Sequence, residues 1–89
     1  MKYAVVVMDS QKLDLDVSIY PSIEKAEEAL INKYRAYIIY LSNNKADFHA
    51  HLDSKEDDGY IHYAFIYERK ETAIDSISVR IRLGIVEEE

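Results

Sequence analysis

The order of apolar and polar residues along the chain predicts five strands. Residues 13–20 and 77–84 alternate strictly between apolar and polar side chains, which is typical of strands with one covered face. Residues 3–8 form a continuous, valine-rich apolar run, and such runs favour a strand in the interior of a sheet. Residues 48–57 and 60–68, on either side of Asp58-Gly59, are the remaining two candidates.

Between the second and third of these strands the apolar period becomes helical. Ser22 follows Pro21 and is a good N-cap for a helix that begins at Ile23. Six apolar residues then recur on one side of the helix: Ile23, Ala26, Leu30, Tyr34, Tyr37 and Leu41. Residues 37–41 are also rich in β-formers, so a strand there is a competing interpretation. No turn signal precedes them, and we expect the helix to continue through them and to end near Asn43-Asn44.

The predicted order of elements is therefore ββαβββ. One helix covers only one face of a mostly antiparallel sheet of about five strands, so the pattern predicts a two-layer α+β fold. We expect a single domain over residues 1–86, followed by an acidic C-terminal tail at residues 87–89.

Residues 48–68 are predicted to form a β-hairpin. Asp58-Gly59 is typical of a two-residue type I′ turn, which needs positive φ at both central positions. Counting from this turn places Leu52 opposite Phe65 and His49 opposite Glu68. One face of the hairpin then holds Phe48, Ala50, Leu52, Tyr63, Phe65 and Tyr67. The other holds His49, His51, His62, Ala64, Ile66 and Glu68.

The sheet face without a helix is expected to be open in a monomer. The alternation adds to it Asp14, Asp16, Ser18, Arg80 and Arg82, with either Ala4, Val6 and Met8 or Tyr3, Val5 and Val7. Contiguous exposed apolar area usually marks an interface, so we expect a homodimer formed face to face or edge to edge through the sheet. The late part of the helix is apolar on several sides and is a further contact candidate. The candidate interface residues are His49, His51, His62, Ala64, Ile66, Ile38, Ile39 and Tyr40.

Composition and charge narrow the classes of function. The chain has 89 residues, a formal net charge of −6 and no cysteine, so it has no disulfide and no thiolate metal site. Nonspecific binding to a nucleic-acid backbone needs clustered Lys and Arg, which an acidic chain disfavours. The sequence contains no signal-peptide pattern and no run of about 20 apolar residues. We therefore expect a cytoplasmic protein with neither a membrane nor a direct nucleic-acid partner.

Candidate chemistry is sparse. The sequence contains no Gly-x-Ser-x-Gly elbow, no phosphate-binding glycine loop and no dinucleotide fingerprint, so we expect no catalysis and no cofactor. His49 and His51 would point to the same side of a strand, and Glu68 opposite them would supply a third metal ligand. A metal-binding or small-molecule-binding domain that uses these three residues is therefore one hypothesis.

The leading hypothesis is a small, non-catalytic protein-binding module of the inhibitor, antitoxin or accessory-factor type. Its surface would be acidic and rich in tyrosine, of which the chain has 8. Such a surface suits a basic protein partner, because opposite charge accelerates and orients the encounter.

Overall fold

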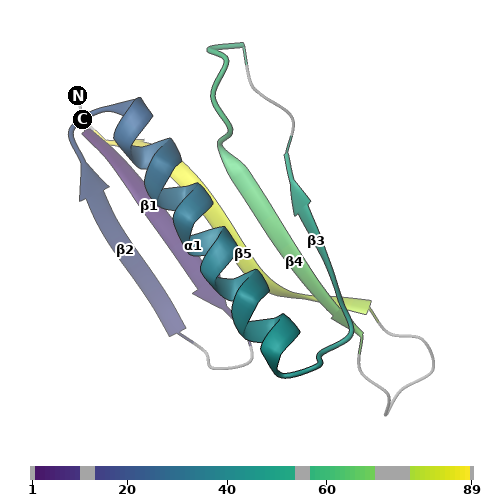
Figure 1. The fold of residues 1–89 in the computed structure, drawn as a ribbon. Helices are drawn as coiled ribbons and strands as arrows, with labels where there is room; N and C mark the ends of the chain where they lie inside the picture. The colour runs from purple at the N-terminus through teal and green to yellow at the C-terminus, as the bar shows by residue number, and fades with distance from the viewer. Residues whose placement is uncertain (1, 11–13, 54–56, 70–76, 89) are drawn as a thin grey trace.

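The computed structural model describes residues 2–10, 14–53, 57–69 and 77–88, and for residues 69, 77–80 and 88 it describes the backbone alone. Within these residues the elements follow the predicted order ββαβββ (Figure 1). The strands are β1 (Lys2–Asp9), β2 (Asp14–Tyr20), β3 (Phe48–Leu52), β4 (Tyr63–Arg69) and β5 (Ile77–Glu88), and the helix is α1 (Ile23–Asn43). Because β5 continues to Glu88, most of the expected acidic tail extends this strand, and Glu89 lies outside the described residues.

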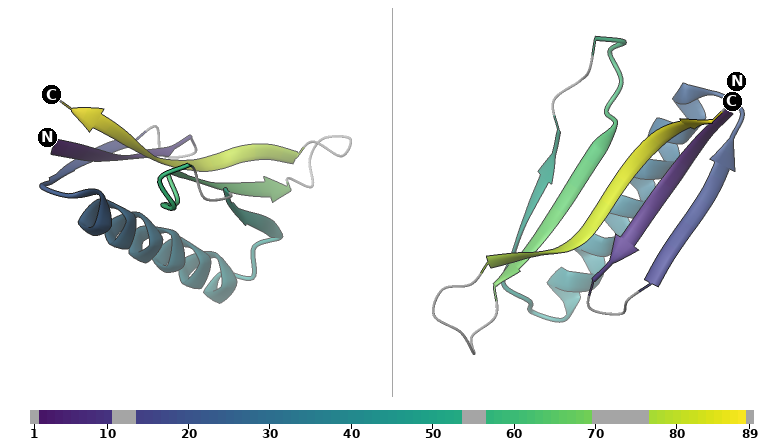
Figure 2. Two further views of the ribbon diagram at one scale, coloured as in Figure 1. Left: turned by 90° about the horizontal axis from the view of Figure 1, so that it is seen from above. Right: turned by 180° about the vertical axis from the view of Figure 1, so that it is seen from behind.

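The strands form one sheet with the order β2-β1-β5-β4-β3. All four pairings are antiparallel. The valine-rich β1 is an interior strand, as its apolar run predicts, and β5 lies in the middle of the sheet. The helix packs on one face of the sheet, and no described element covers the other (Figure 2). The predicted two-layer α+β fold is confirmed.

The helix begins and ends where its sequence predicts. The Ser22 side chain accepts a hydrogen bond from the backbone N–H of Lys25 (N···Oγ 3.3 Å). This bond satisfies one of the backbone N–H groups that have no partner within the helix at its N-terminus. The helix continues through residues 37–41, so the competing strand interpretation is wrong. Packing decides this, because Leu41 is buried against the sheet with 1% of its surface exposed.

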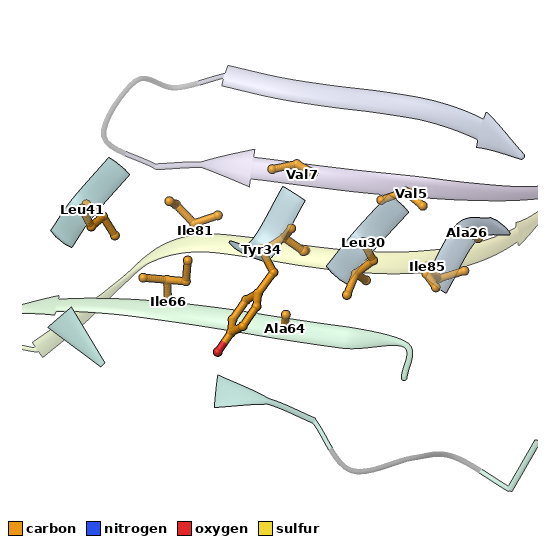
Figure 3. Packing of buried hydrophobic residues seen from close by; sticks show 11 residues of the cluster. Val5, Val7, Ala26, Leu30, Tyr34, Leu41, Ala64, Ile66, Ile81 and Ile85 are labelled. Atoms are coloured by element: carbon orange, nitrogen blue, oxygen red, sulfur yellow. The ribbon is translucent and has the colours of Figure 1, made fainter. Parts of the chain in front are cut away.

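The hydrophobic core lies between α1 and the covered face of the sheet (Figure 3). The helix contributes Ala26, Leu30, Tyr34 and Leu41, and the sheet contributes Val5, Val7, Ala64, Ile66, Ile81, Leu83 and Ile85. The helix residues are those of the predicted apolar line, and Ile23 and Tyr37 are partly buried beside them. The sheet residues come from β1, β5 and β4, so the two edge strands add little to the core.

The pairing of β3 with β4 is shifted by one residue from the predicted register. His49 pairs with Tyr67 and His51 pairs with Phe65. The shift arises because β3 ends at Leu52 and β4 begins at Tyr63, so residues 53–62 connect them in place of a two-residue turn.

Asp58-Gly59 does form a turn within this connection, but not a type I′ turn. Gly59 has a φ of +83°, and the only other described residue with a positive φ is Lys45. A type I′ turn needs positive φ at both central residues. The Asp58 side chain instead accepts a hydrogen bond from the backbone N–H of Tyr60 (2.9 Å), the local closure that Asp supplies in Asx-type turns.

A shift of one residue moves every side chain of a strand to the opposite face. Ala64 and Ile66, predicted on the open face, are instead fully buried under the helix. The aromatic side chains of Tyr63, Phe65 and Tyr67, predicted in the core, lie on the open side. The prediction of the two faces of β4 was therefore wrong.

The faces of β2 are also reversed. Ser18 pairs with the buried Val5, and Asp16 pairs with the buried Val7, so the polar side of β2 faces the helix layer. There the Lys33 ammonium lies 3.2 Å from Asp16 Oδ2. The apolar side, with Leu15, Val17 and Ile19, faces away from the helix. Arg82 is on the open face as predicted, whereas the side chain of Arg80 lies outside the described residues.

The faces assigned to β4 and β2 predict a clear difference in stability between two identical substitutions, one on each strand. Ile66→Ala removes a fully buried side chain and should lower the free energy of unfolding by about 2–5 kcal/mol. Ile19→Ala acts on the open face, where the side chain is 48% exposed, and should cost about 1 kcal/mol or less. Chemical denaturation of both variants measures the difference, and an equal loss would contradict the described register.

Candidate functional site

The sheet face turned away from α1 is the main candidate site. Antiparallel pairing arranges its outward side chains in rows that cross the strands. The first row is Leu15, Met8, Arg82, Phe65 and His51; the second is Val17, Val6, Gly84 and Tyr63; the third is Ile19, Ala4 and Val86. These residues, together with His49 and Tyr67, are named the open face below.

The open face is hydrophobic and largely exposed, although Ala4 on β1 is buried, with 3% of its surface exposed. Six of its large apolar side chains expose two fifths of their surface or more: Leu15 65%, Val86 53%, Met8 50%, Val17 50%, Ile19 48% and Tyr63 42%. Phe65 and Tyr67 extend this surface toward β3, with their ring centroids 6.3 Å apart. Soluble monomers rarely expose so many contiguous apolar side chains, and such patches commonly bind another molecule.

Charge is distributed unequally between the two sides of the sheet. Among the described side chains, the open face carries no carboxylate, and Arg82 is exposed at its centre on the middle strand. The carboxylates of β1 and β2 are on the side of the sheet that faces the helix, and those of α1 are on the helix itself. They are Asp9, Asp14, Asp16, Glu24, Glu27 and Glu28. A chain of net charge −6 therefore has an apolar, weakly cationic face and an acidic one.

An acidic pocket lies between α1 and one end of the sheet. Its volume is about 280 Å³, and it is lined by Val7, Asp9, Asp14, Leu15, Asp16 and Tyr37. Burial raises the pKa of the Tyr37 hydroxyl, and the nearby carboxylates of Asp9 and Asp16 raise it further. The described residues nevertheless include no group of three His, Asp or Glu side chains arranged to hold a metal ion.

The connection between β3 and β4 is anchored to the start of the helix. The Tyr60 hydroxyl donates a hydrogen bond to Glu24 (2.9 Å), and the backbone N–H of Ile61 donates one to Glu27 (2.8 Å). A hydrogen bond to its own backbone N–H lowers the pKa of Glu24, and the Tyr60 bond lowers it further. These contacts hold residues 57–62 against α1.

His62 belongs to this connection and not to a strand. Its Nε2 lies 2.8 Å from Asp58 Oδ2, and the pKa of Asp58 is lowered, first by the backbone N–H of Tyr60 and then by His62. The two side chains line a cavity of about 360 Å³ together with Tyr3, Tyr63, Ile85, Val86 and Glu87.

The three residues predicted to bind a metal do not converge. His49 and His51 lie on the open face, whereas Glu68 pairs with Phe48, which packs against the core, and shares its side of the sheet. The one-residue change of register separates the carboxylate from the imidazoles. The described register therefore does not support a three-ligand site at these positions.

The predicted interface residues are dispersed over the molecule. His49 and His51 are on the open face, but Ala64 and Ile66 are buried in the core. The helix places Ile39 (60% exposed) and Tyr40 (47% exposed) on the opposite layer of the molecule, while Ile38 is partly buried against the core. Sequence reasoning missed the outward positions of β2 and β4: Leu15, Val17, Ile19, Tyr63, Phe65 and Tyr67. Strict alternation divides these strands into two faces, but it does not say which face turns inward.

Comparison with known proteins adds no assignment. No protein-family model matches the chain, and no curated protein or solved structure gives a significant match.

In the part of the chain that the structure describes, no helix combines the length and the apolar character needed to cross a lipid bilayer.

The surroundings of Tyr37 predict a loss of stability at alkaline pH. Its pKa is raised in the folded state, so the unfolded chain loses this proton first, and stability falls as the pH rises above about 10. Tyr37→Phe has no such proton. Denaturation from pH 8 to pH 11 should therefore show a smaller alkaline loss for this variant than for the natural chain, and identical losses would contradict the assignment.

Proposed function

We propose that this chain is a small, non-catalytic protein-binding module that uses its open face as the binding surface. The main observation in its favour is that the outward side chains of that face form continuous apolar rows across the strands. Exposed apolar side chains from β2, β1, β5 and β4 lie side by side on it, and no described carboxylate interrupts them. Covering this surface with another protein would remove it from water, which stabilises the complex roughly in proportion to the apolar area buried.

The dimensions of the molecule support a binding surface of ordinary size. The accessible surface is 6145 Å², whereas about 5400 Å² is expected for a compact monomer of this mass. Five strands spaced about 4.8 Å apart, each about 25 Å long, give the face a projected area on the order of 600 Å². A stable interface usually takes about 800 Å² from each partner, so the open face is large enough to supply most of one.

Arg82 indicates the chemistry of the partner. It lies between Met8 and Phe65 in its row, and it makes no ion pair with any described residue. Burying a charge without a counter-charge is costly. The best partner therefore presents apolar side chains around at least one carboxylate. A second copy placed face to face would bring its own Arg82 near the first, which disfavours that arrangement.

The acidic helix layer is a second surface of the same module. Glu24 and Glu28 are exposed near the start of α1, and they stay accessible when the open face is covered. They suit a basic region of a partner and would accelerate its approach. This combination of an apolar binding face and a charged flank would suit a protein of the inhibitor, antitoxin or accessory-factor type.

Affinity capture with matched baits tests the proposal. The wild-type chain is compared with a Met8→Asp/Val86→Asp bait, which places two charges on the open face, and with an Ile39→Asp bait on the helix layer. All three substituted side chains are at least 50% exposed, so the fold should tolerate each change. If the open face is the binding surface, the wild-type and Ile39→Asp baits should both retain a protein that the open-face bait no longer captures. It fails if the open-face substitutions leave every captured protein unchanged.

A further inference from the structure

We propose that two copies of this chain pair edge to edge through β2, with the two β2 strands antiparallel, so that their sheets join into one continuous sheet. This contact uses the edge of the sheet and leaves the open face accessible. The inference therefore goes beyond the proposed function and does not depend on it.

The edge formed by β2 lacks most of the features that prevent strands from pairing. Edge strands are commonly protected by short length, charged side chains, Pro, bulges or a covering element. β2 has 7 residues, Asp14–Tyr20, and it contains neither Lys nor Pro. Its pairing with β1 is continuous from Asp14 to Tyr20. No described strand lies on its outer side, so its outward backbone groups can accept a new partner.

The two charged residues of β2 do not oppose this pairing. Asp14 and Asp16 face the helix layer, and Asp16 is already paired with Lys33 (3.2 Å). The helix lies mainly over the interior strands, and β2 lies to one side of it, at the edge of the sheet (Figure 1). A second sheet can therefore approach this edge without meeting α1.

The sequence of β2 is complementary to itself in one antiparallel register. With the two-fold axis at Val17, Val17 faces Val17 of the second copy, and Leu15 faces Ile19. On the helix side, Asp16 faces Ser18 and Asp14 faces Tyr20. All seven residues are paired, apolar side chains meet apolar side chains, and no carboxylate opposes another. An axis at Asp16 would place two carboxylates directly opposite one another, which is unfavourable.

Competing arrangements of two copies fit less well. Pairing face to face brings two Arg82 side chains together near the axis without a described carboxylate between them. Pairing through the other edge uses β3, which has only 5 residues, and an axis at Ala50 would place His49 opposite His51. The β2 edge therefore offers the longest contact without opposed like charges.

Disulfide trapping tests the arrangement cleanly, because the natural chain has no cysteine. Directly opposed residues of antiparallel strands have Cα atoms about 4.5–5.5 Å apart, which lies within disulfide range. Three single-cysteine variants are compared. Val17→Cys lies at the axis, and Met8→Cys has the same 50% exposure as Val17. Tyr63→Cys lies on β4, in the same row of the open face as Val17. Under mild oxidation, Val17→Cys should form the covalent dimer at least about tenfold faster than either control, because pairing raises its effective concentration.

Equal rates for Val17→Cys and Met8→Cys would overturn the proposal, since they would indicate random collision. Fastest trapping by Tyr63→Cys would also overturn it, in favour of a face-to-face dimer. Sedimentation equilibrium gives an independent measurement on the uncrosslinked chain. The wild type and Met8→Asp should reach the dimer mass, while Val17→Asp, with two carboxylates at the axis, should remain a folded monomer by circular dichroism. A wild-type chain that stays monomeric at several hundred micromolar would contradict the pairing, whatever the capture experiment shows.

Discussion

The packing of α1 on the sheet buries side chains from one side of β1, β4 and β5, and the other features of the molecule depend on this contact. Burying a large aliphatic side chain such as Leu30 or Ile66 contributes about 1.5–3 kcal/mol. The chain has 89 residues and no disulfide, so this single layer has to supply most of its stability. Because there is one described helix, the same sheet has a second face that no described element covers.

The distribution of charge follows the same division. Carboxylates of β2 and α1 gather on the covered side, where Lys33 and the Tyr60 hydroxyl interact with two of them. The uncovered side keeps apolar side chains and the cationic Arg82. Electrostatic repulsion between acidic groups therefore falls on the helix layer and does not oppose contacts made through the open face.

Local signals predicted the elements, and long-range contacts decided their faces. The N-cap at Ser22 and the helical line from Ala26 to Leu41 follow from neighbouring residues, so the sequence alone was sufficient for them. The β3–β4 register was not predictable in this way. It depends on the connection between β3 and β4, where Tyr60 and Ile61 donate hydrogen bonds to the distant helix residues Glu24 and Glu27. The candidate site was mispredicted for the same reason, because its membership depends on which side of β2 and β4 turns outward.

Methyl NMR with a water-soluble paramagnetic probe can show which residues lie on each face of the sheet. The probe relaxes methyl groups according to their accessibility. The described faces predict strong relaxation for Leu15, Val17 and Ile19 and weak relaxation for Ile66 and Ile81, at a concentration where the chain is monomeric. Strong relaxation of Ile66 together with protection of Val17 would contradict this prediction, because it would mean that the faces of β2 and β4 are the reverse of those described.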